Sequence, residues 1–331
     1  MTLPTVFVTA ATGTQGGALA RHLRKLGWGV HTTTRKPSSP SAQALAAIGV
    51  KITHCEWLDQ PALVSALSGC QALYLVLMPV RSDPASEPRF TASFLTAART
   101  AGVKQIIYSA AIHIDHLPGF DPTHWSSPFL LARRESDNIV TAAFTTTVTT
   151  TTDTNANTGA AGSGFEYLTI LRPGTFMTNF LTPKIKMLYP RATTQGIFDI
   201  AMQRDSPFPF ALTDPEDIAK LATAALSNPE KFHGKDITFC SDLLEVQQVI
   251  NTLGDVAGRN SELKIQVWDE DSIKAMEDGD KKIMLEIQRI TGVVGGLIDA
   301  AELGRWGITG TTWRAFLEKE REGVVETFGG L

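Results

Sequence analysis

Residues 9–17 read TAATGTQGG, and this stretch decides the fold. It follows a short apolar and β-branched run at residues 5–9 and precedes apolar residues at helical spacing from Gly17 to Leu26. In the pattern G-x-x-G-x-x-G the first position is Ala10, and Gly13 and Gly16 follow. Gly13 lets the backbone approach a pyrophosphate, Gly16 lets the helix pack close to the strand, and the helix N-terminus presents N–H groups to the anion. The expected cofactor contacts in this turn are Thr9, Ala10, Thr12, Gly13, Thr14, Gln15 and Gly16.

Strand-like and helix-like segments alternate outward from this turn across the first half of the chain. Such alternation predicts parallel strands joined by crossover helices, that is, an α/β fold with a Rossmann-type doubly wound parallel sheet. The expected strands are residues 5–9, 29–34, 50–54, 72–77, 105–109 and 167–171, and the expected helices are 17–26, 41–48, 61–67, 88–101 and one that ends near Val140.

From Pro173 onward the alternation weakens, and a smaller C-terminal α+β lobe is expected. Its helices are predicted at residues 217–226, 245–256, 272–277, 281–290 and 311–320, and its strands at 235–239 and 264–268. We therefore expect a Rossmann domain at 1–172 and a substrate or partner lobe at 173–331, with elements that return to the main sheet. Ligands of open α/β sheets bind at the strand ends, over which this lobe is expected to lie.

Threonine dominates one segment of the first half: ten of the eighteen residues at 141–158 are threonine. A segment of this composition buries too little apolar surface to offset its ordering entropy. We therefore predict a mobile surface loop at residues 141–164, inserted before the strand that resumes the sheet.

The composition excludes several classes of protein. With 43% hydrophobic and 19% charged residues among 331, the chain has ordinary globular usage and is neither disordered nor collagen-like. Its 34 acidic and 30 basic residues give a net charge of −4, so the cationic field that direct nucleic-acid binding uses is absent. Three cysteines without CxxC spacing argue against a disulfide framework, and no metal site is predicted. Neither a leader nor an apolar run of about 18 residues is visible, so we expect no membrane contact and a cytoplasmic location.

The end of the second expected strand predicts which dinucleotide is bound. An NAD site usually has an acidic residue here, which holds the ribose 2′-hydroxyl. This chain instead has Arg35, nineteen residues after Gly16, and then Lys36, two cations that suit a 2′-phosphate. A solvated basic turn is the alternative. We predict that Arg35 and Lys36 bind NADP(H).

Together these features resemble the NmrA-like family of atypical short-chain dehydrogenase/reductases. The resemblance spans nearly the whole chain and rests on residues 9–17, 35–36, 168–181 (LTILRPGTFMTNFL), 214–219 (DPEDIA), 232–235 (FHGK) and 312–317 (TWRAFL). It implies a Rossmann-type core, NADP(H) binding and a small C-terminal lobe. The family contains both enzymes and redox-sensing regulators that perform no chemistry.

The resemblance also implies a tyrosine as proton donor and, four residues later, a lysine that holds the nicotinamide ribose. In the matching helix this chain has Phe129 and Arg133. Phenylalanine cannot donate a proton, whereas the fork of Arg133 could still hold the ribose hydroxyls. Arg133 is therefore expected to serve the cofactor and the catalytic site.

Two other side chains are candidates for catalysis. Ser109 ends the fifth strand, near the place where the superfamily has a serine that polarises the carbonyl, and a serine that caps backbone groups is the alternative. His124 resembles a family histidine before the active-site helix and can exchange a proton near neutral pH, and a satisfied loop histidine is the alternative. The substrate pocket is expected to contain Trp125, Phe129, Phe176 and Asn179, with Met177 and Phe180 beside them, unless these aromatics only pack the lobe interface.

Three functions are compatible with these residues. The first is an NADP(H)-dependent oxidoreductase that acts on a small apolar or aromatic carbonyl or enone compound. The second is a non-catalytic NADP(H)-sensing regulator that binds a partner protein, which the missing tyrosine–lysine pair favours. The third is a redox-neutral isomerase or cyclase on the same fold. We favour the first, with a small-molecule substrate.

Overall fold

The computed structural model describes residues 4–78, 80, 82–111, 127–148, 164–201, 209–277, 279–295 and 298–331. The chain forms two compact units, each assembled from separate stretches. Unit 1 consists of Met1–Ala111, Pro122–Arg172 and Ile218–Ile237, and unit 2 of Ile112–Asp121, Pro173–Asp217 and Thr238–Leu331. Within the described part of the chain, every helix is too short or too polar to span a bilayer.

Unit 1 is built on a seven-stranded sheet with the order β10-β6-β5-β4-β1-β2-β3. Every neighbouring pair from β3 to β6 is parallel. The strands are β1 (Thr5–Val8), β2 (Gly29–Thr34), β3 (Lys51–His54), β4 (Ala72–Leu75), β5 (Gln105–Ser109), β6 (Tyr167–Pro173) and β10 (Lys235–Phe239). The strand order reverses at β1, which pairs with β2 on one side and β4 on the other. The predicted α/β, doubly wound architecture is confirmed.

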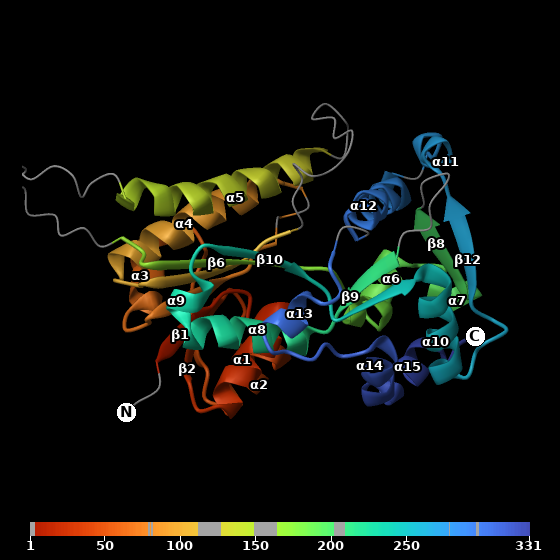
Figure 1. Ribbon diagram of the computed structural model, residues 1–331, viewed down its shortest axis with the longest axis horizontal. Helices are drawn as coiled ribbons and strands as arrows, with labels where there is room; N and C mark the ends of the chain where they lie inside the picture. The colour runs from red at the N-terminus through yellow and green to blue at the C-terminus, as the bar shows by residue number, and fades with distance from the viewer. Residues whose placement is uncertain are drawn as a thin grey trace, which may run out of the picture. The chain divides into compact units, whose positions relative to one another are not determined.

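Helices cover both faces of this sheet, as Figure 1 shows: α3, α4 and α5 lie on one face, and α1, α2 and α8 on the other. Their bounds, with those of the short α9, are α1 (Thr14–Lys25), α2 (Pro40–Ala47), α3 (Gln60–Leu67), α4 (Ser86–Thr100), α5 (Ser127–Val148), α8 (Pro215–Ser227) and α9 (Pro229–Phe232). The side chain of Ser39 accepts a hydrogen bond from Ala42 N and caps the start of α2, and that of Asp59 accepts one from Ala62 N and caps the start of α3.

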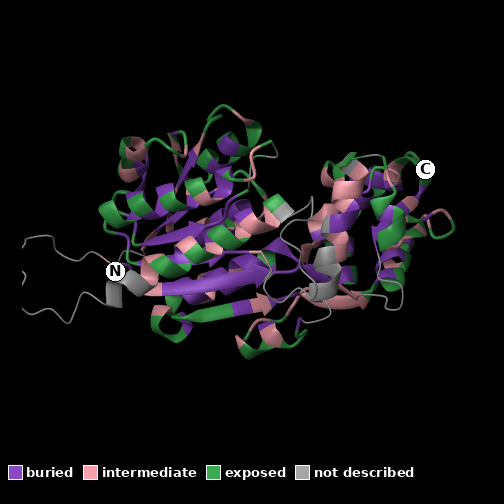
Figure 2. Ribbon diagram, turned by 90° about the horizontal axis from the view of Figure 1, so that it is seen from above, coloured by how far each residue is buried: buried purple, intermediate pink, exposed green. Residues whose placement is uncertain are grey.

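The core of unit 1 lies between the sheet and its helices. Phe7, Leu73 and Ile106, in β1, β4 and β5, are fully buried and pack with Leu63 of α3 and Phe94 of α4. Figure 2 shows the central strands buried, while the covering helices expose their outer residues. A parallel sheet covered on both faces needs continuous apolar strands, which is why these strands are recognisable in the sequence.

The helix α5 corrects one expectation. The threonine-rich loop was expected to start at residue 141, whereas α5 continues to Val148. Ala143 and Phe144 pack against the core, and the ring of Phe144 stacks on that of Phe165 with centroids 6.1 Å apart. This apolar contact holds the extra turns of the helix against the core. Residues 149–163 of the expected loop lie outside the described residues.

Unit 2 contains two small sheets, with the orders β11-β9-β7 and β12-β8. The strands are β7 (Thr175–Phe176), β8 (Ile197–Ala201), β9 (Pro209–Thr213), β11 (Asp242–Glu245) and β12 (Lys264–Trp268). The helices are η3 (Met177–Phe180), α6 (Lys184–Leu188), α7 (Ala192–Gln195), α10 (Val246–Ala257), α11 (Glu270–Lys274), α12 (Gly279–Gly295), α13 (Glu302–Arg305), α14 (Trp313–Lys319) and α15 (Arg321–Phe328). An aromatic core joins them, in which the ring of Phe180 lies 5.1 Å from Trp313 and 5.4 Å from Tyr189.

Candidate cofactor site

The carboxyl ends of β1 and β4 define the candidate site, because ligands of open α/β sheets bind where the strand order reverses. Thr9 follows β1 and is fully buried. Its hydroxyl donates to Val76 O at 2.7 Å and also accepts a hydrogen bond from Val76 N at 2.7 Å. Thr9 thus ties the end of β1 to the residue after β4, and its side chain is satisfied inside the protein.

The turn after β1 is compact and open to solvent. Ala10 has a φ of +47°, a left-handed conformation at the position where the glycine pattern expects its first glycine. Gly13 N donates to Ala10 O at 2.8 Å, and both Thr12 and Gly13 are exposed. α1 then begins at Thr14, with no acidic residue in its first turn. An exposed turn at a helix N-terminus without negative charge fits the pyrophosphate of a dinucleotide.

Gly16 lies where α1 approaches β1 most closely. A Cβ atom on Gly16 would lie 2.5 Å from Thr9 O and 2.6 Å from Ala10 O, distances that folded proteins do not tolerate. On Gly13 the nearest atom would be Ala10 O at 3.2 Å. The close helix–strand packing expected at Gly16 therefore agrees with the geometry.

Gln15 connects the turn to the ends of two further strands. Its Oε1 accepts hydrogen bonds from Ser109 Oγ at 2.6 Å and from Tyr74 Oη at 3.1 Å. Ser109 ends β5 and is 3% exposed, and burial raises the pKa of Tyr74, so this phenol is a donor at neutral pH. With the amide oxygen occupied by two donors, the amide nitrogen of Gln15 is the group that is left for a ligand.

Arg35 and Lys36 follow β2 directly, and both are exposed. The backbone N–H of Lys36 donates to Thr34 Oγ1 at 3.2 Å, which shapes the turn. Within the described ranges, no residue pairs with the guanidinium of Arg35. Two cations at the carboxyl end of β2 suit a 2′-phosphate, and their contact with the cofactor stays a prediction.

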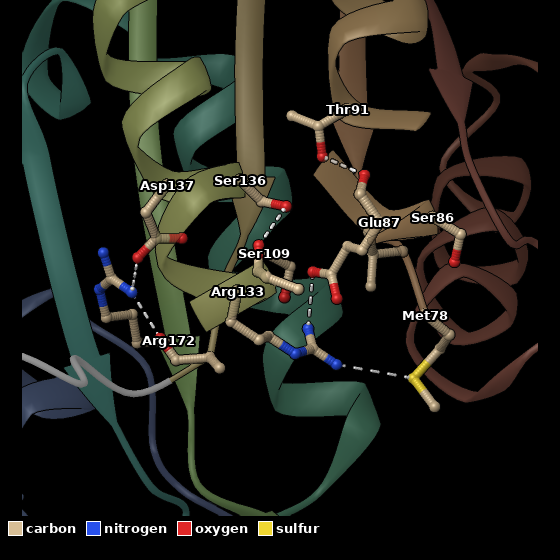
Figure 3. Close-up of polar contacts among 12 residues, drawn as sticks. Met78, Ser86, Glu87, Thr91, Ser109, Arg133, Ser136, Asp137 and Arg172 are labelled. Atoms are coloured by element: carbon tan, nitrogen blue, oxygen red, sulfur yellow. Dashed lines mark hydrogen bonds and ion pairs between the residues drawn. The ribbon is translucent and has the colours of Figure 1, made fainter. Parts of the chain in front are cut away.

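Arg133 lies on the inner side of α5, one turn after the half-buried Phe129. Its Nη1 donates to Oε1 of Glu87 at 3.2 Å, and its Nη2 lies 4.0 Å from the sulfur of Met78, just beyond the end of β4 (Figure 3). The side chain of Arg133 is 24% exposed and that of Glu87 only 1%. Burial raises the pKa of Glu87, an effect that Arg133 partly offsets and Asp137 reinforces. The guanidinium of Arg133 therefore lies at the carboxyl edge of the sheet and is paired with the buried carboxylate of Glu87.

Arg172 anchors α5 to the sheet. This arginine of β6 is 1% exposed, donates from Nη1 to Asp137 Oδ2 at 2.7 Å and to Ala111 O, and donates from Nε to Asp236 Oδ1 at 2.8 Å. Sequence reasoning missed both Arg172 and Glu87 as structural parts of the site. The available signal for Arg172 was its position at the end of an apolar strand, since a charge that is buried there needs counter-charges.

The other candidates are placed as follows. His124 and Trp125 lie outside the described residues. Phe176 and Asn179 belong to unit 2, where both are half-buried and Lys184 Nζ lies 6.0 Å from the ring of Phe176. The expectation that Met177 and Phe180 line a cleft is wrong, because both are fully buried in the aromatic core of unit 2.

Cysteines and potential metal ligands are dispersed over the described parts of the chain. Cys55, Cys70 and Cys240 are buried and unbridged, and burial raises the pKa of each thiol. Among the residues that the structure describes, no three His, Cys, Asp or Glu side chains gather in a way that could hold a metal ion.

Comparison with protein families gives one match over most of the chain. The model described as the NmrA-like family matches residues 3–129 and 159–302. Among curated proteins, the NmrA-like family domain-containing oxidoreductase himF of Aspergillus japonicus is 26% identical over 279 residues, which cover 79% of this chain and 75% of that protein.

Solved structures resemble the whole chain at lower identity. One is the NADPH-dependent quinone oxidoreductase QOR2 of Escherichia coli, complexed with NADPH. It has a TM-score of 0.68 at 22% identity, and the aligned region covers 95% of this chain and 99% of the QOR2 chain. NmrA, a negative transcriptional regulator in complex with NAD, has a TM-score of 0.64 at 18% identity and covers 99% of this chain and 96% of its own. At these identities the two matches establish the fold.

Proposed function

Because the chain belongs to the NmrA-like family, as its motifs suggested, we propose that it is an NADP(H)-dependent oxidoreductase that reduces a small apolar or aromatic carbonyl or enone compound. The observation that carries the proposal is the open turn at Thr12 and Gly13, at the point where the strand order reverses, with Arg35 unpaired among the described residues at the next strand end. The NADPH that is bound to QOR2, a protein of the same fold, supports this choice of cofactor.

Each part of the site has one task in this proposal. The N–H groups at the start of α1 bind the pyrophosphate, Arg35 and Lys36 bind the 2′-phosphate, and Arg133 donates to the nicotinamide ribose hydroxyls. The cofactor supplies the hydride when it is bound. His124 donates the proton to the substrate oxygen, since Phe129 has no hydroxyl, and Ser109 orients Gln15 through the 2.6 Å hydrogen bond. Phe129 and Trp125 contact the substrate.

Arg35→Ala is expected to weaken NADPH binding by about 10- to 100-fold and to leave NADH binding unchanged, because a charge-assisted contact to the 2′-phosphate is lost. Titration of both cofactors by fluorescence or calorimetry measures this. Arg134→Ala, an exposed arginine next to Arg133, is the matched control and should bind NADPH as the parent does. Equal affinity of the parent protein for NADPH and NADH would contradict the assignment.

His124→Ala is expected to lower turnover by about 100-fold, the scale of a lost general acid. NADPH affinity should stay the same, because the predicted cofactor contacts are elsewhere. His22→Ala serves as the control. His22 lies in the last turn of α1, and because α1 is a crossover helix between parallel strands, its last turn lies at the edge of the sheet opposite to the proposed site. Full turnover of the His124 variant would remove this histidine from the mechanism.

A second candidate function is an NADP(H)-sensing regulator that binds a partner protein. Phe129 favours it, because the family resemblance assigns this position of α5 to the superfamily's proton donor, and phenylalanine cannot donate a proton. Nicotinamide absorbance with a panel of quinones, aromatic ketones and enones, run beside a pull-down with and without NADPH, separates the two functions. NADPH binding without oxidation by any acceptor, together with cofactor-dependent capture of one protein, would replace the enzyme by the regulator.

A further inference from the structure

We propose that Glu87 is a positioning residue, whose buried carboxylate holds the guanidinium of Arg133 at the carboxyl edge of the sheet for binding of the nicotinamide ribose. This inference rests on the proposed function, because it assigns a task to Arg133 in cofactor binding. Glu87 itself is too deeply buried to touch a ligand, and its effect on the cofactor therefore passes through Arg133.

The contacts of the two side chains support this division of tasks. Glu87 lies in the first turn of α4, opposite Arg133 on α5, and the two side chains point toward each other in Figure 3. Only Oε1 of Glu87 pairs with Arg133, at 3.2 Å, and Oε2 is buried without a hydrogen-bond partner in the described structure. Among the residues that the structure describes, the other arm of the guanidinium has only the weak acceptor Sδ of Met78, 4.0 Å away. Arg133 is thus held on one arm and keeps N–H donors for a ligand on the other.

The charges around Glu87 explain why it controls Arg133. Asp137 of α5 lies one turn after Arg133 and is engaged by Arg172, so it does not compete for the same guanidinium. Tyr108 of β5 is buried beside this group, and burial, Asp137 and Glu87 all raise the pKa of its hydroxyl, so it stays neutral. Among the described neighbours, Glu87 is therefore the anion that orients Arg133.

The arrangement is costly for folding, which argues against a purely structural role. A buried carboxylate with one unpartnered oxygen disfavours the folded state. The cation that Glu87→Gln leaves behind stays in contact with solvent, because the side chain of Arg133 is 24% exposed, so this change does not leave a fully buried charge without its partner. Burial raises the pKa of Glu87, so this residue contributes stability below its ordinary pKa, and that contribution is lost as the pH rises through the raised value. Glu87→Gln should therefore be at least as stable as the parent protein at neutral and alkaline pH.

The experiment compares two ligands, NADPH and 2′,5′-ADP, which lacks the nicotinamide ribose. For Glu87→Gln we expect about tenfold weaker NADPH binding, unchanged 2′,5′-ADP binding and a thermal midpoint at neutral pH equal to or above that of the parent. Glu166→Gln makes the same chemical change in the exposed pair with Lys104 and should leave both affinities unchanged. A double-mutant cycle adds Arg133→Ala and Glu87→Gln/Arg133→Ala, and the Glu87 change should have no further effect once Arg133 is gone.

The outcomes distinguish the inference from the function on which it rests. Unchanged NADPH affinity in Glu87→Gln, equal weakening of both ligands, or an effect that persists without Arg133 would overturn the positioning role alone. If the parent protein bound NADPH no more tightly than NADH, and showed no preference for 2′,5′-ADP over NADH either, the proposed function would be overturned. The positioning role would then be overturned as well.

Discussion

Arg172→Met is expected to lower the free energy of unfolding by about 3–5 kcal/mol, the cost of removing one partner from a buried ion pair. The side chain of Arg172 is 2% exposed, and its partners Asp137 and Asp236 are 23% and 32% exposed. Methionine fills much of the volume of arginine but leaves two carboxylates without their shared cation and Ala111 O without its donor. Urea denaturation followed by circular dichroism measures the loss.

Two further variants make this result specific. Arg172→Met combined with Asp137→Asn should regain part of the stability, because one of the uncompensated charges is removed as well. Arg305→Met breaks the ion pairs of an exposed arginine with Asp299 and Glu302 and should change stability little. A parent-like denaturation curve for Arg172→Met would show that the buried pairs do not anchor α5.

Gly16→Ala is expected to abolish measurable NADPH binding and to cost about 3 kcal/mol of stability, the upper range for overpacking a close contact. The added methyl group would lie 2.5 Å from Thr9 O, a backbone atom that moves only if α1 or the turn moves. Such a shift displaces the N–H groups that are proposed to bind the pyrophosphate. Urea denaturation and cofactor titration measure the two effects.

Gly323 provides the matched control for this substitution. It is also a glycine inside a helix, α15, but nothing lies within 4 Å of an added Cβ atom there. Gly323→Ala should therefore raise stability by about 1 kcal/mol, because alanine favours the helix and meets no obstacle. If both variants lost stability equally, close packing at Gly16 would not be the cause.

The centre of the sheet in unit 1 was predictable because β1, β4 and β5 are short, largely apolar and buried runs that need no distant partner to be recognised. The start of α1 was expected at Gly17 and lies at Thr14, since glycine counts against a helix although Gly16 is what lets this helix pack on β1. In unit 2, four strands were not predicted: β7, β8, β9 and β11. The reason is clearest for β8. Its central Asp199 disfavours a strand in isolation and is stabilised by Arg191 Nη1 at 2.8 Å and Trp268 Nε1 at 2.7 Å.

The residues of the candidate site also fall into two groups: those that the local sequence indicates, and those whose partners are distant in the sequence. The glycine turn and Arg35 are local features whose position after a strand already indicates their chemistry. The partners of Arg133 and Arg172 are not local: Glu87 is 46 residues from Arg133, and Asp236 is 64 residues from Arg172. A glutamate in the first turn of a helix is expected to be exposed near the helix dipole, and no pattern around Glu87 indicates that this one is buried.

During synthesis on the ribosome, the last segment of unit 1, Ile218–Ile237, is made after the first large segment of unit 2. α8 and β10 follow after the chain has passed through Pro173–Asp217, so β6 has no partner on its outer side until residue 237 has been made. At roughly 5–20 residues per second, the 65 residues from Pro173 to Ile237 leave this edge open for roughly 3–13 seconds. The edge carries Leu168, Ile170 and Leu171, and an open apolar strand edge is a template for pairing with other chains. A fragment that stops at Arg172 is therefore expected to aggregate through the open edge of β6.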